Sequence, residues 1–149
     1  MKSDVSHVTN EGAGFDEALA QAEGVARAEY MGVPCQIRMD WFNPSKGLVD
    51  LKTTAELRFF ESDARRYNYI EQMAFYRTII RILTGETVPV HIIAVEKVEP
   101  FAAGVWMLTP NVLDDAENIN NAALERFKYS VSENYWPSGY ETVRLIDTL

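Results

Sequence analysis

The chain has 149 residues, of which 47% are hydrophobic, and a formal net charge of −8 at pH 7. A chain of this length can bury one sizeable core, so we expect a single domain over residues 1–149. No apolar run approaches the roughly 20 residues that a membrane-spanning helix needs, and the amino terminus lacks the apolar core of a signal peptide.

The lone cysteine excludes an internal disulfide and any all-cysteine metal site within one chain. We therefore expect a cytoplasmic protein that does not enter a membrane. The net acidity argues against a general nucleic-acid coat protein, which is normally basic. It does not exclude a metal-dependent phosphodiesterase, because bound metal ions supply positive charge where the phosphate binds.

The first half of the chain predicts one short helix and three strands. Residues 1–14 are polar and carry two glycines, so we expect a loosely ordered start. A short helix is expected over residues 15–22, ending near Gly24. Composition and turn residues then predict strands over residues 25–30, 34–42 and 48–53, with turns at Met31-Gly32 and Asn43-Pro44-Ser45-Lys46-Gly47.

A charged connector over residues 56–64 follows, in which Ser62 or Asp63 is a candidate helix cap. The next segment, 65–84, has helical periodicity, and Gly85 is well placed to end that helix. Residues 88–98 form a long β-rich run with little alternation, which predicts a strand buried on both faces.

The last quarter of the chain predicts a hairpin and a long helix. Glu99-Pro100 and Gly104 mark a turn that leads to a strand over residues 105–108. Thr109-Pro110 then opens a helix that runs to about Asn134. Its apolar stripe consists of Leu113, Ala116, Ala123, Leu124, Phe127 and Val131. The order α-β-β-β-α-β-β-α predicts an α/β (α+β) domain with a mixed sheet flanked by helices.

Two acids and a lysine follow two apolar runs that flank the second turn. Asp40 lies near the end of the first run, and Asp50-Leu51-Lys52 ends the second. Because strand side chains alternate, Asp50 and Lys52 share one face while Leu51 points away. A hairpin can bring Asp40 to the same place, and such a polar cluster is costly to desolvate unless a divalent cation compensates.

A second polar group lies on the expected helix. Tyr69, Gln72 and Tyr76 are spaced i, i+3 and i+7, so they share one helical face. A half-buried glutamine needs hydrogen-bond partners, and a carboxylate or a substrate phosphate would provide them. The alternative is that the tyrosines are rim aromatics and Gln72 is solvated.

The combination of Asp40, Asp50-Leu51-Lys52 and Gln72-Met73-Ala74-Phe75-Tyr76 resembles the PD-(D/E)XK nuclease superfamily. It is most similar to the branch with a Gln-x-x-x-Tyr helix, which holds RecB-type nuclease domains and phage recombination exonucleases. The runs 32–41, 49–54 and 67–76 resemble the RecE-type (exonuclease VIII-like) group in particular. The resemblance implies a restriction-endonuclease-like fold.

The resemblance also implies a role for each site residue. Asp40, Asp50 and the Leu51 carbonyl would bind Mg²⁺ or Mn²⁺, which prefer oxygen ligands. Lys52 would orient or help deprotonate the attacking water and offset charge in the transition state. Gln72 and Tyr76 would position the site and the DNA backbone. Candidate DNA contacts are Thr53, Thr54, Arg65, Arg66 and Tyr69.

Each candidate DNA contact has a structural alternative. The threonines are equally typical of a strand end, and the arginines of a solvated helix start. The function implied by the resemblance is a metal-dependent exodeoxyribonuclease that digests linear duplex DNA 5′ to 3′ without ATP, leaving a single strand. A homo-oligomeric ring and a single-strand annealing protein are the implied partners. The alternatives are a catalytically decayed nuclease fold that binds DNA or assembles with a partner, and an endonuclease on the same fold.

Nucleases of this kind usually carry a His or Glu on an upstream helix that completes the metal site. Glu17, Glu23 and His7 are the candidates here, each with a solvated surface residue as the alternative reading. The short upstream segment also fits a truncated or minimal version of the domain. Five other side chains are expected to be structural: His91 in a strand, and Cys35, Trp106, Phe127 and Trp136 in the core.

Overall fold

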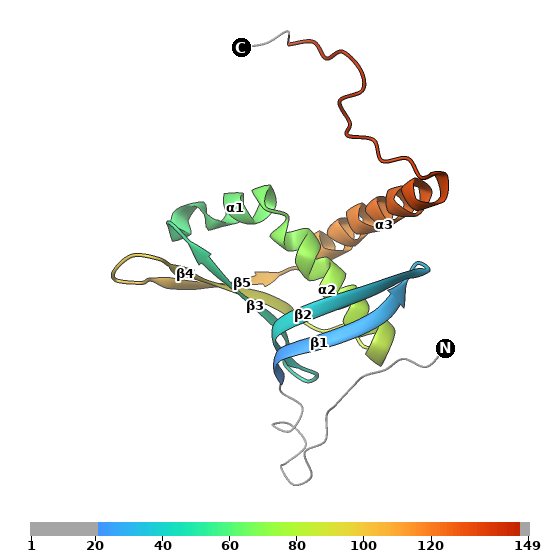
Figure 1. Ribbon diagram of the computed structural model, residues 1–149. Helices are drawn as coiled ribbons and strands as arrows, with labels where there is room; N and C mark the ends of the chain where they lie inside the picture. Colours follow the sequence, from blue (N-terminus) through green and yellow to red (C-terminus); the bar gives the residue numbers. More distant parts are fainter. Residues whose placement is uncertain (1–20, 147–149) are drawn as a thin grey trace.

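The computed structural model describes residues 21–146, and its five strands form one sheet in the order β1-β2-β3-β4-β5. The strands are β1 (Gln21–Tyr30), β2 (Val33–Asn43), β3 (Gly47–Thr54), β4 (Val90–Glu96) and β5 (Ala103–Leu108). The helices are a 3-10 helix (Leu57–Phe59), α1 (Phe60–Arg66), α2 (Tyr69–Thr84) and α3 (Pro110–Glu133). The helices lie on one side of the sheet (Figure 1). The predicted α+β class is confirmed.

The sheet is mixed because one of its four ladders is parallel. β3 and β4 run parallel, from Leu48↔Val90 to Thr54↔Glu96, whereas every other neighbouring pair is antiparallel. A parallel pair needs a crossover connection, and here the 3-10 helix, α1 and α2 supply it. This crossover places α2 over the sheet next to β3, the strand that carries Asp50, Leu51 and Lys52 of the predicted site together with Thr53 and Thr54.

The β1–β2 hairpin has the predicted turn but begins earlier than expected. Met31 and Gly32 both have positive φ, 53° and 80°, which suits a two-residue turn between right-twisted strands. Of the helix expected over residues 15–22, residues 15–20 lie outside the described part. The rest of that prediction is wrong, since Gln21 and Ala22 pair with β2 and Gly24 pairs with Met39. The ladder to β2 overrides the helical preference of this alanine-rich segment.

The turn between β2 and β3 is held by its own residues. The Asn43 side-chain oxygen accepts hydrogen bonds from the backbone N–H groups of Ser45 and Lys46, at 2.9 and 3.0 Å. Gly47 has a φ of 109°, and a Cβ atom there would lie 2.3 Å from the Pro89 carbonyl oxygen. Only glycine therefore allows β3 to start this close to the segment that enters β4.

β2 and β3 separate soon after this turn. Their ladder ends at the pair Trp41↔Val49, whereas β2 continues to pair with β1 along most of its length. In Figure 1 the β1–β2 hairpin accordingly turns away from β3, β4 and β5 and runs beneath α2. The split leaves a gap in the ladder beside residues 50–52.

The crossover helices differ from the sequence prediction. The helix expected over residues 65–84 is interrupted at Asn68, whose φ of 57° is left-handed, and only α2 ends at Gly85 as predicted. The connector is helical as well, so Ser62 and Asp63 lie inside α1 and do not cap a helix. The buried pair Phe60 and Ala64, spaced i and i+4, explains this earlier start.

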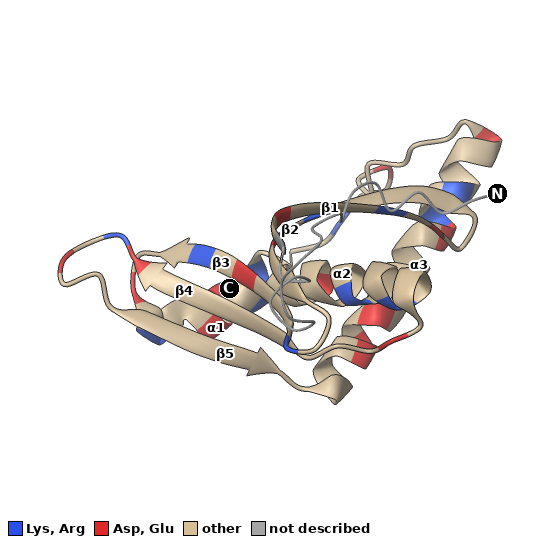
Figure 2. Cartoon of the chain, turned by 90° about the horizontal axis from the view of Figure 1, so that it is seen from below, with Lys and Arg blue, Asp and Glu red and all other residues tan. Residues whose placement is uncertain are grey.

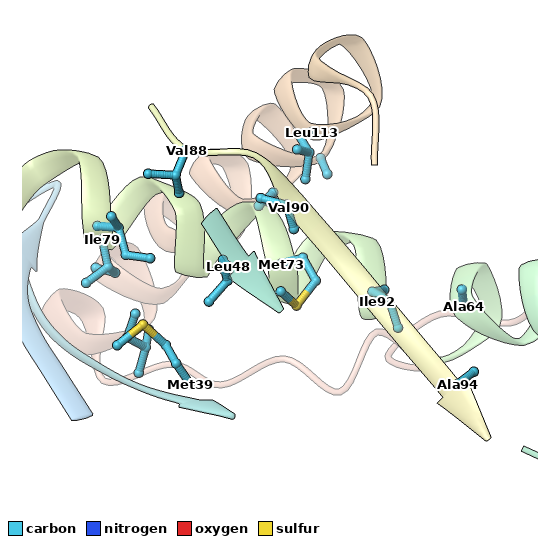
Figure 3. Close-up of a cluster of buried hydrophobic side chains, with 14 of the residues drawn as sticks. Met39, Leu48, Ala64, Met73, Ile79, Val88, Val90, Ile92, Ala94 and Leu113 are labelled. Atoms are coloured by element: carbon cyan, nitrogen blue, oxygen red, sulfur yellow. The ribbon is translucent and has the colours of Figure 1, made fainter. Parts of the chain in front are cut away.

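The core lies between the sheet and α2. Figure 3 shows Met73 of α2 beside Leu48 of β3 and Val90 of β4, and all three are fully buried. β4 alternates: Val90, Ile92 and Ala94 are buried, whereas His91, Ile93 and Val95 are partly exposed. The expectation that this strand is buried on both faces is therefore wrong, because the described helices cover one face only. His91 is a strand histidine, as expected.

α3 begins at Pro110 and ends before Asn134, close to the predicted bounds. It is tied to α2 by ion pairs from Arg77 to Asp114 and Glu117, at 2.6 and 3.3 Å, and from Arg81 to Glu117 at 2.5 Å. Within residues 21–146, no helix is both long and apolar enough to cross a membrane.

The aromatic residues expected in the core divide into two groups. Trp106 packs against buried Phe60, with ring centroids 4.5 Å apart. Phe127 and Trp136 are 44% and 60% exposed and contact each other at 6.0 Å, so their assignment to the core is wrong. The second half of α3 extends past the sheet (Figure 1), so the described strands do not cover these rings. Cys35 packs against the core, and burial raises the pKa of its thiol.

Candidate active site

Asp50 and Lys52 lie on the face of β3 that α2 covers. Asp50 is 4% exposed, whereas Leu51 between them is 58% exposed and points the other way. The Lys52 Nζ lies 2.7 Å from Asp50 Oδ2. Figure 2 shows the acidic and basic residues of β3 next to each other near the end of that strand. The predicted alternation is therefore observed.

Asp40 reaches the same place from β2. Where the two strands separate, the backbone N–H of Leu51 has no partner on β2, and it donates instead to Asp40 Oδ2 at 2.7 Å. The N–H and C=O of one strand residue point to the same side, so the Leu51 carbonyl also faces the gap beside Asp40. Both oxygens therefore border the opening between β2 and β3.

Burial and the charge of Asp40 act on the pKa of Asp50 in the direction opposite to that of Lys52. Burial raises the pKa of Asp50, the hydrogen bond and charge of Lys52 lower it, and the negative charge of Asp40 raises it again. Asp50 Oδ2 is buried and, apart from the ion pair, accepts no well-aligned hydrogen bond from residues 21–146. Lys52 thus pairs with Asp50 alone, and the second carboxylate, Asp40, adds negative charge nearby that this ammonium group does not contact.

α2 completes the polar cluster from above. Lys52 Nζ donates to Gln72 Oε1 at 3.0 Å, and Gln72 Nε2 donates to Tyr76 Oη at 3.1 Å. Lys52 Nζ also lies 4.5 Å from the centre of the Tyr69 ring. The predicted helix face is therefore the face that meets β3, and Gln72 is half-buried with both ends of its amide hydrogen-bonded. The ammonium is held in one position by a carboxylate, an amide and an aromatic ring.

The donor set suits a hard divalent cation. Asp40, Asp50 and the Leu51 carbonyl offer oxygen ligands at one opening, and the buried Asp50 Oδ2 can accept a further positive partner. Among residues 21–146, no three His, Cys, Asp or Glu side chains lie close enough together to hold a metal ion. Mg²⁺ needs only one or two carboxylates, because waters and substrate oxygens complete its shell.

The upstream candidates do not supply a third acid in this part of the chain. Glu17 and His7 lie outside the described residues. Glu23 is exposed and forms an ion pair with Arg38 on the neighbouring strand, which agrees with the surface alternative.

The candidate DNA contacts are spread over several surfaces. Thr54 is buried and its Oγ1 donates to the Glu56 carbonyl at 3.3 Å, which favours a strand-end role, while Thr53 is exposed. Arg65 and Arg66 are exposed on α1, where Arg65 lies 3.8 Å from Glu61 and Arg66 lies 5.5 Å from the Tyr67 ring. Of the five candidates, Tyr69 is the one shown in contact with Lys52.

Sequence reasoning missed the contribution of α3. The Asn120 side chain donates to the backbone carbonyl of Glu71 at 2.8 Å, next to Gln72 in the chain. The buried Arg77 fixes the following turn of α2 against the same helix. These contacts join residues 37 to 49 positions apart, so no local pattern could reveal them.

The mixed sheet, the two acids and lysine at its split, and the glutamine above them define the PD-(D/E)XK fold class. The family model of a PDDEXK-like domain of unknown function, DUF3799, matches residues 17–148, and the chain belongs to that family. The superfamily assignment made from sequence is thereby confirmed, whereas the narrower resemblance to RecE-type exonucleases stays a prediction.

A solved structure agrees with this fold. The crystal structure of a candidate exonuclease from Eubacterium rectale superposes with a TM-score of 0.70 at 21% sequence identity. The match covers 86% of this chain and 55% of that chain, so this chain spans about half the length of the protein it resembles. At this identity the likeness shows the fold. No protein of curated function matches the chain.

Proposed function

We propose that this domain is a metal-dependent deoxyribonuclease that hydrolyses phosphodiester bonds, with Mg²⁺ or Mn²⁺ as cofactor. The observation that carries the proposal is the buried Asp50–Lys52–Gln72 cluster. Burying an ammonium beside two carboxylates at a sheet opening is costly, and an apolar core would not require it. Membership of a PDDEXK-like family supports the same class.

The roles of the residues follow from their contacts. Asp40, Asp50 and the Leu51 carbonyl would hold the cation, which when bound lowers the pKa of a water ligand and neutralises charge on the phosphate. Lys52 is fixed by Asp50 and Gln72, so its ammonium can orient the attacking water and stabilise charge that develops on the phosphate oxygens. Through its hydrogen bond to Gln72, Tyr76 keeps the amide in the correct orientation.

The more specific part of the proposal concerns substrate and partners. We propose an exonuclease of the phage or prophage recombination type that acts on linear duplex DNA in the cytoplasm and leaves a single strand. A ring of identical subunits and a single-strand annealing protein would be its partners. Thr53, Arg65 and Arg66 are exposed and available to a DNA backbone. The E. rectale neighbour, described as a candidate exonuclease, supports this direction.

A decayed nuclease fold that binds DNA without cutting it is the second candidate. It is favoured by the lack of a third acidic side chain near Asp40 and Asp50 among residues 21–146. An endonuclease on the same fold is the third. The assay below separates all three.

The test uses end-labelled linear duplex DNA and closed circular DNA, each incubated with the protein and Mg²⁺, Mn²⁺ or EDTA. We expect metal-dependent loss of linear DNA only. Asp50→Asn and Lys52→Met are expected to abolish this loss, whereas Asp115→Asn on exposed α3 and Lys46→Ala in the exposed turn serve as matched controls and should not. Cutting of circles would indicate an endonuclease, and no hydrolysis with any metal would leave only the DNA-binding candidate.

A further inference from the structure

A groove runs between α2 and α3 next to the candidate active site. It encloses about 540 Å³ and is open to solvent along its length. This volume lies within the roughly 300–1,000 Å³ typical of small-ligand sites. Its lining includes Asn68, which precedes α2, then Gln72, Phe75 and Tyr76 from α2, and Asn120 and Arg126 from α3.

The groove and the active site share two residues. Gln72 and Tyr76 line the groove, and the same two side chains continue the hydrogen-bond chain that starts at Lys52. A ligand in the groove therefore lies directly beside the residues proposed to act on the phosphodiester bond.

The relative orientation of α2 and α3 determines which residues lie at each end of the groove. Arg77 of α2 contacts Asp114 of α3, whereas Glu71, earlier in α2, contacts Asn120, later in α3. The two helices are therefore antiparallel, and Arg126 lies toward the start of α2, near Asn68. Ile119 and Arg126 are seven residues apart on α3, so this wall of the groove is about 10 Å long.

The chemistry of the walls matches a nucleotide. Phe75 and Tyr76 offer aromatic rings on which a base can stack, and Asn68 and Asn120 add amide groups to the same walls. Arg126 is exposed and forms no hydrogen bond or ion pair with residues 21–146, so its guanidinium is available to a phosphate. Glu71 Oε2, in the same wall, is a buried acceptor without a donor in that part of the chain, which suits a ligand that carries N–H groups.

We propose that this groove binds one unpaired nucleotide of the substrate DNA strand beside the scissile phosphodiester, with its base against Phe75 and Tyr76 and its phosphate on Arg126. The proposal rests on the proposed function, because it takes the adjoining cluster as the nuclease site. It adds a strand-binding subsite on α3, the helix that carries none of the predicted site residues.

The experiment measures binding of a short, fluorescently labelled single-stranded oligodeoxynucleotide by anisotropy. The full chain carries Asp50→Asn so that no DNA is cut. Arg126→Ala is expected to weaken binding about tenfold and to lower the slope of log K against log salt by about 0.7, the value for one lost phosphate contact on a single strand. Phe75→Leu, which keeps an apolar side chain against Tyr30, is expected to weaken binding severalfold without changing that slope.

Lys128→Ala is the matched control. Lys128 lies two residues after Arg126 on α3, on a different face, and is ion-paired with Glu125 at 3.2 Å. Its loss removes the same charge without touching the groove, so binding and salt slope should be unchanged. Equal effects of Arg126→Ala and Lys128→Ala, or no effect of either, would overturn the proposal, as would an Asp50→Asn protein that binds no single strand.

Failure of the groove and failure of the nuclease are distinguishable. If the parent chain cuts DNA and Arg126→Ala cuts with unchanged KM and kcat, the groove is refuted while the nuclease stands. If the parent chain cuts nothing but Arg126→Ala still lowers affinity and salt slope, the groove is supported and the nuclease is refuted. For an active enzyme we expect Arg126→Ala to raise KM about tenfold with little change in kcat.

Discussion

Replacing Lys52 by methionine tests the electrostatics of the site without any substrate. Methionine retains the apolar stem of lysine, so packing beside Tyr69 changes little while the ammonium is lost. The side chains of Asp50 and Lys52 are only 6% and 17% exposed, so solvent screens their interaction weakly. Removing the ammonium leaves the Asp50 carboxylate buried without a partner. We therefore expect the unfolding free energy to fall by about 3 kcal/mol near pH 8.

The reasoning also predicts how the loss of stability in Lys52→Met changes with pH. Burial already raises the pKa of Asp50 and Lys52 opposes that rise, so the variant raises the pKa further. A carboxyl group whose pKa is higher in the folded than in the unfolded state favours folding once it is protonated. The deficit of Lys52→Met relative to the parent chain should therefore shrink as the pH falls from about 8 to about 5, since each unit of pKa is worth about 1.4 kcal/mol.

The assay is urea unfolding in EDTA at several pH values, followed by tryptophan fluorescence. The double variant Asp50→Asn/Lys52→Met removes both charges and should recover most of the loss near pH 8, because no ion is then left buried. A deficit that stays constant across this pH range, or grows as the pH falls, would refute the reasoning. A double variant as unstable as Lys52→Met alone would refute it independently.

Two further predictions concern the scaffold of the site. Gly47→Ala should cost more than about 2 kcal/mol in urea unfolding, because the new Cβ would lie 2.3 Å from the Pro89 carbonyl oxygen at a φ of 109°. A loss below half of that value would show that the approach of β3 to β4 can relax. Arg77→Met should cost only about 1–2 kcal/mol, since Glu117 keeps its ion pair with Arg81 and no acid is left buried alone; a thermal unfolding midpoint lowered by far more than about 8 °C would contradict this.

Much of the fold could be predicted from the sequence because its signals are local. Met31-Gly32 and the segment from Asn43 to Gly47 dictate their turns through backbone geometry, and Gly85 ends α2 for the same reason. Alternation along β3 likewise places Asp50 and Lys52 on one face. Residue types with restricted or unusual backbone conformations can be recognised from the local sequence, without knowledge of the rest of the chain.

The errors arose where a neighbour in space decides the structure. The alanine-rich start of β1 reads as helix until the ladder to β2 is known, and β4 reads as doubly buried until the helices are seen to cover one face. Phe127 and Trp136 look like core residues, but α3 extends beyond the sheet that would cover them.

The site divides in the same way. The pattern of Asp40, Asp50, Lys52 and Gln72 indicates the family, because these residues lie at fixed positions on adjoining elements. The groove between α2 and α3 could not be predicted, since Asn120 contacts α2 at a residue 49 positions away and Arg126 lines the groove only because the two helices pack together. A sequence pattern can therefore identify a candidate catalytic cluster more readily than the surface on which a substrate strand would lie.

The hydrogen bond between Asp40 and the Leu51 N–H gives Asp40 a structural role besides its proposed role as a metal ligand. This affects which substitutions in related chains would indicate a loss of activity. Because β2 leaves β3 at this point, the Leu51 N–H has no partner on β2 and takes the Asp40 carboxylate as its acceptor, whether or not the domain cuts DNA. A relative that had lost catalysis could replace residues 50 and 52 together by apolar side chains and still use an acid or an amide at position 40 as this acceptor. Under the proposed function, loss of the pair Asp50 and Lys52 would thus be a more specific sign of lost activity than the presence or absence of Asp40.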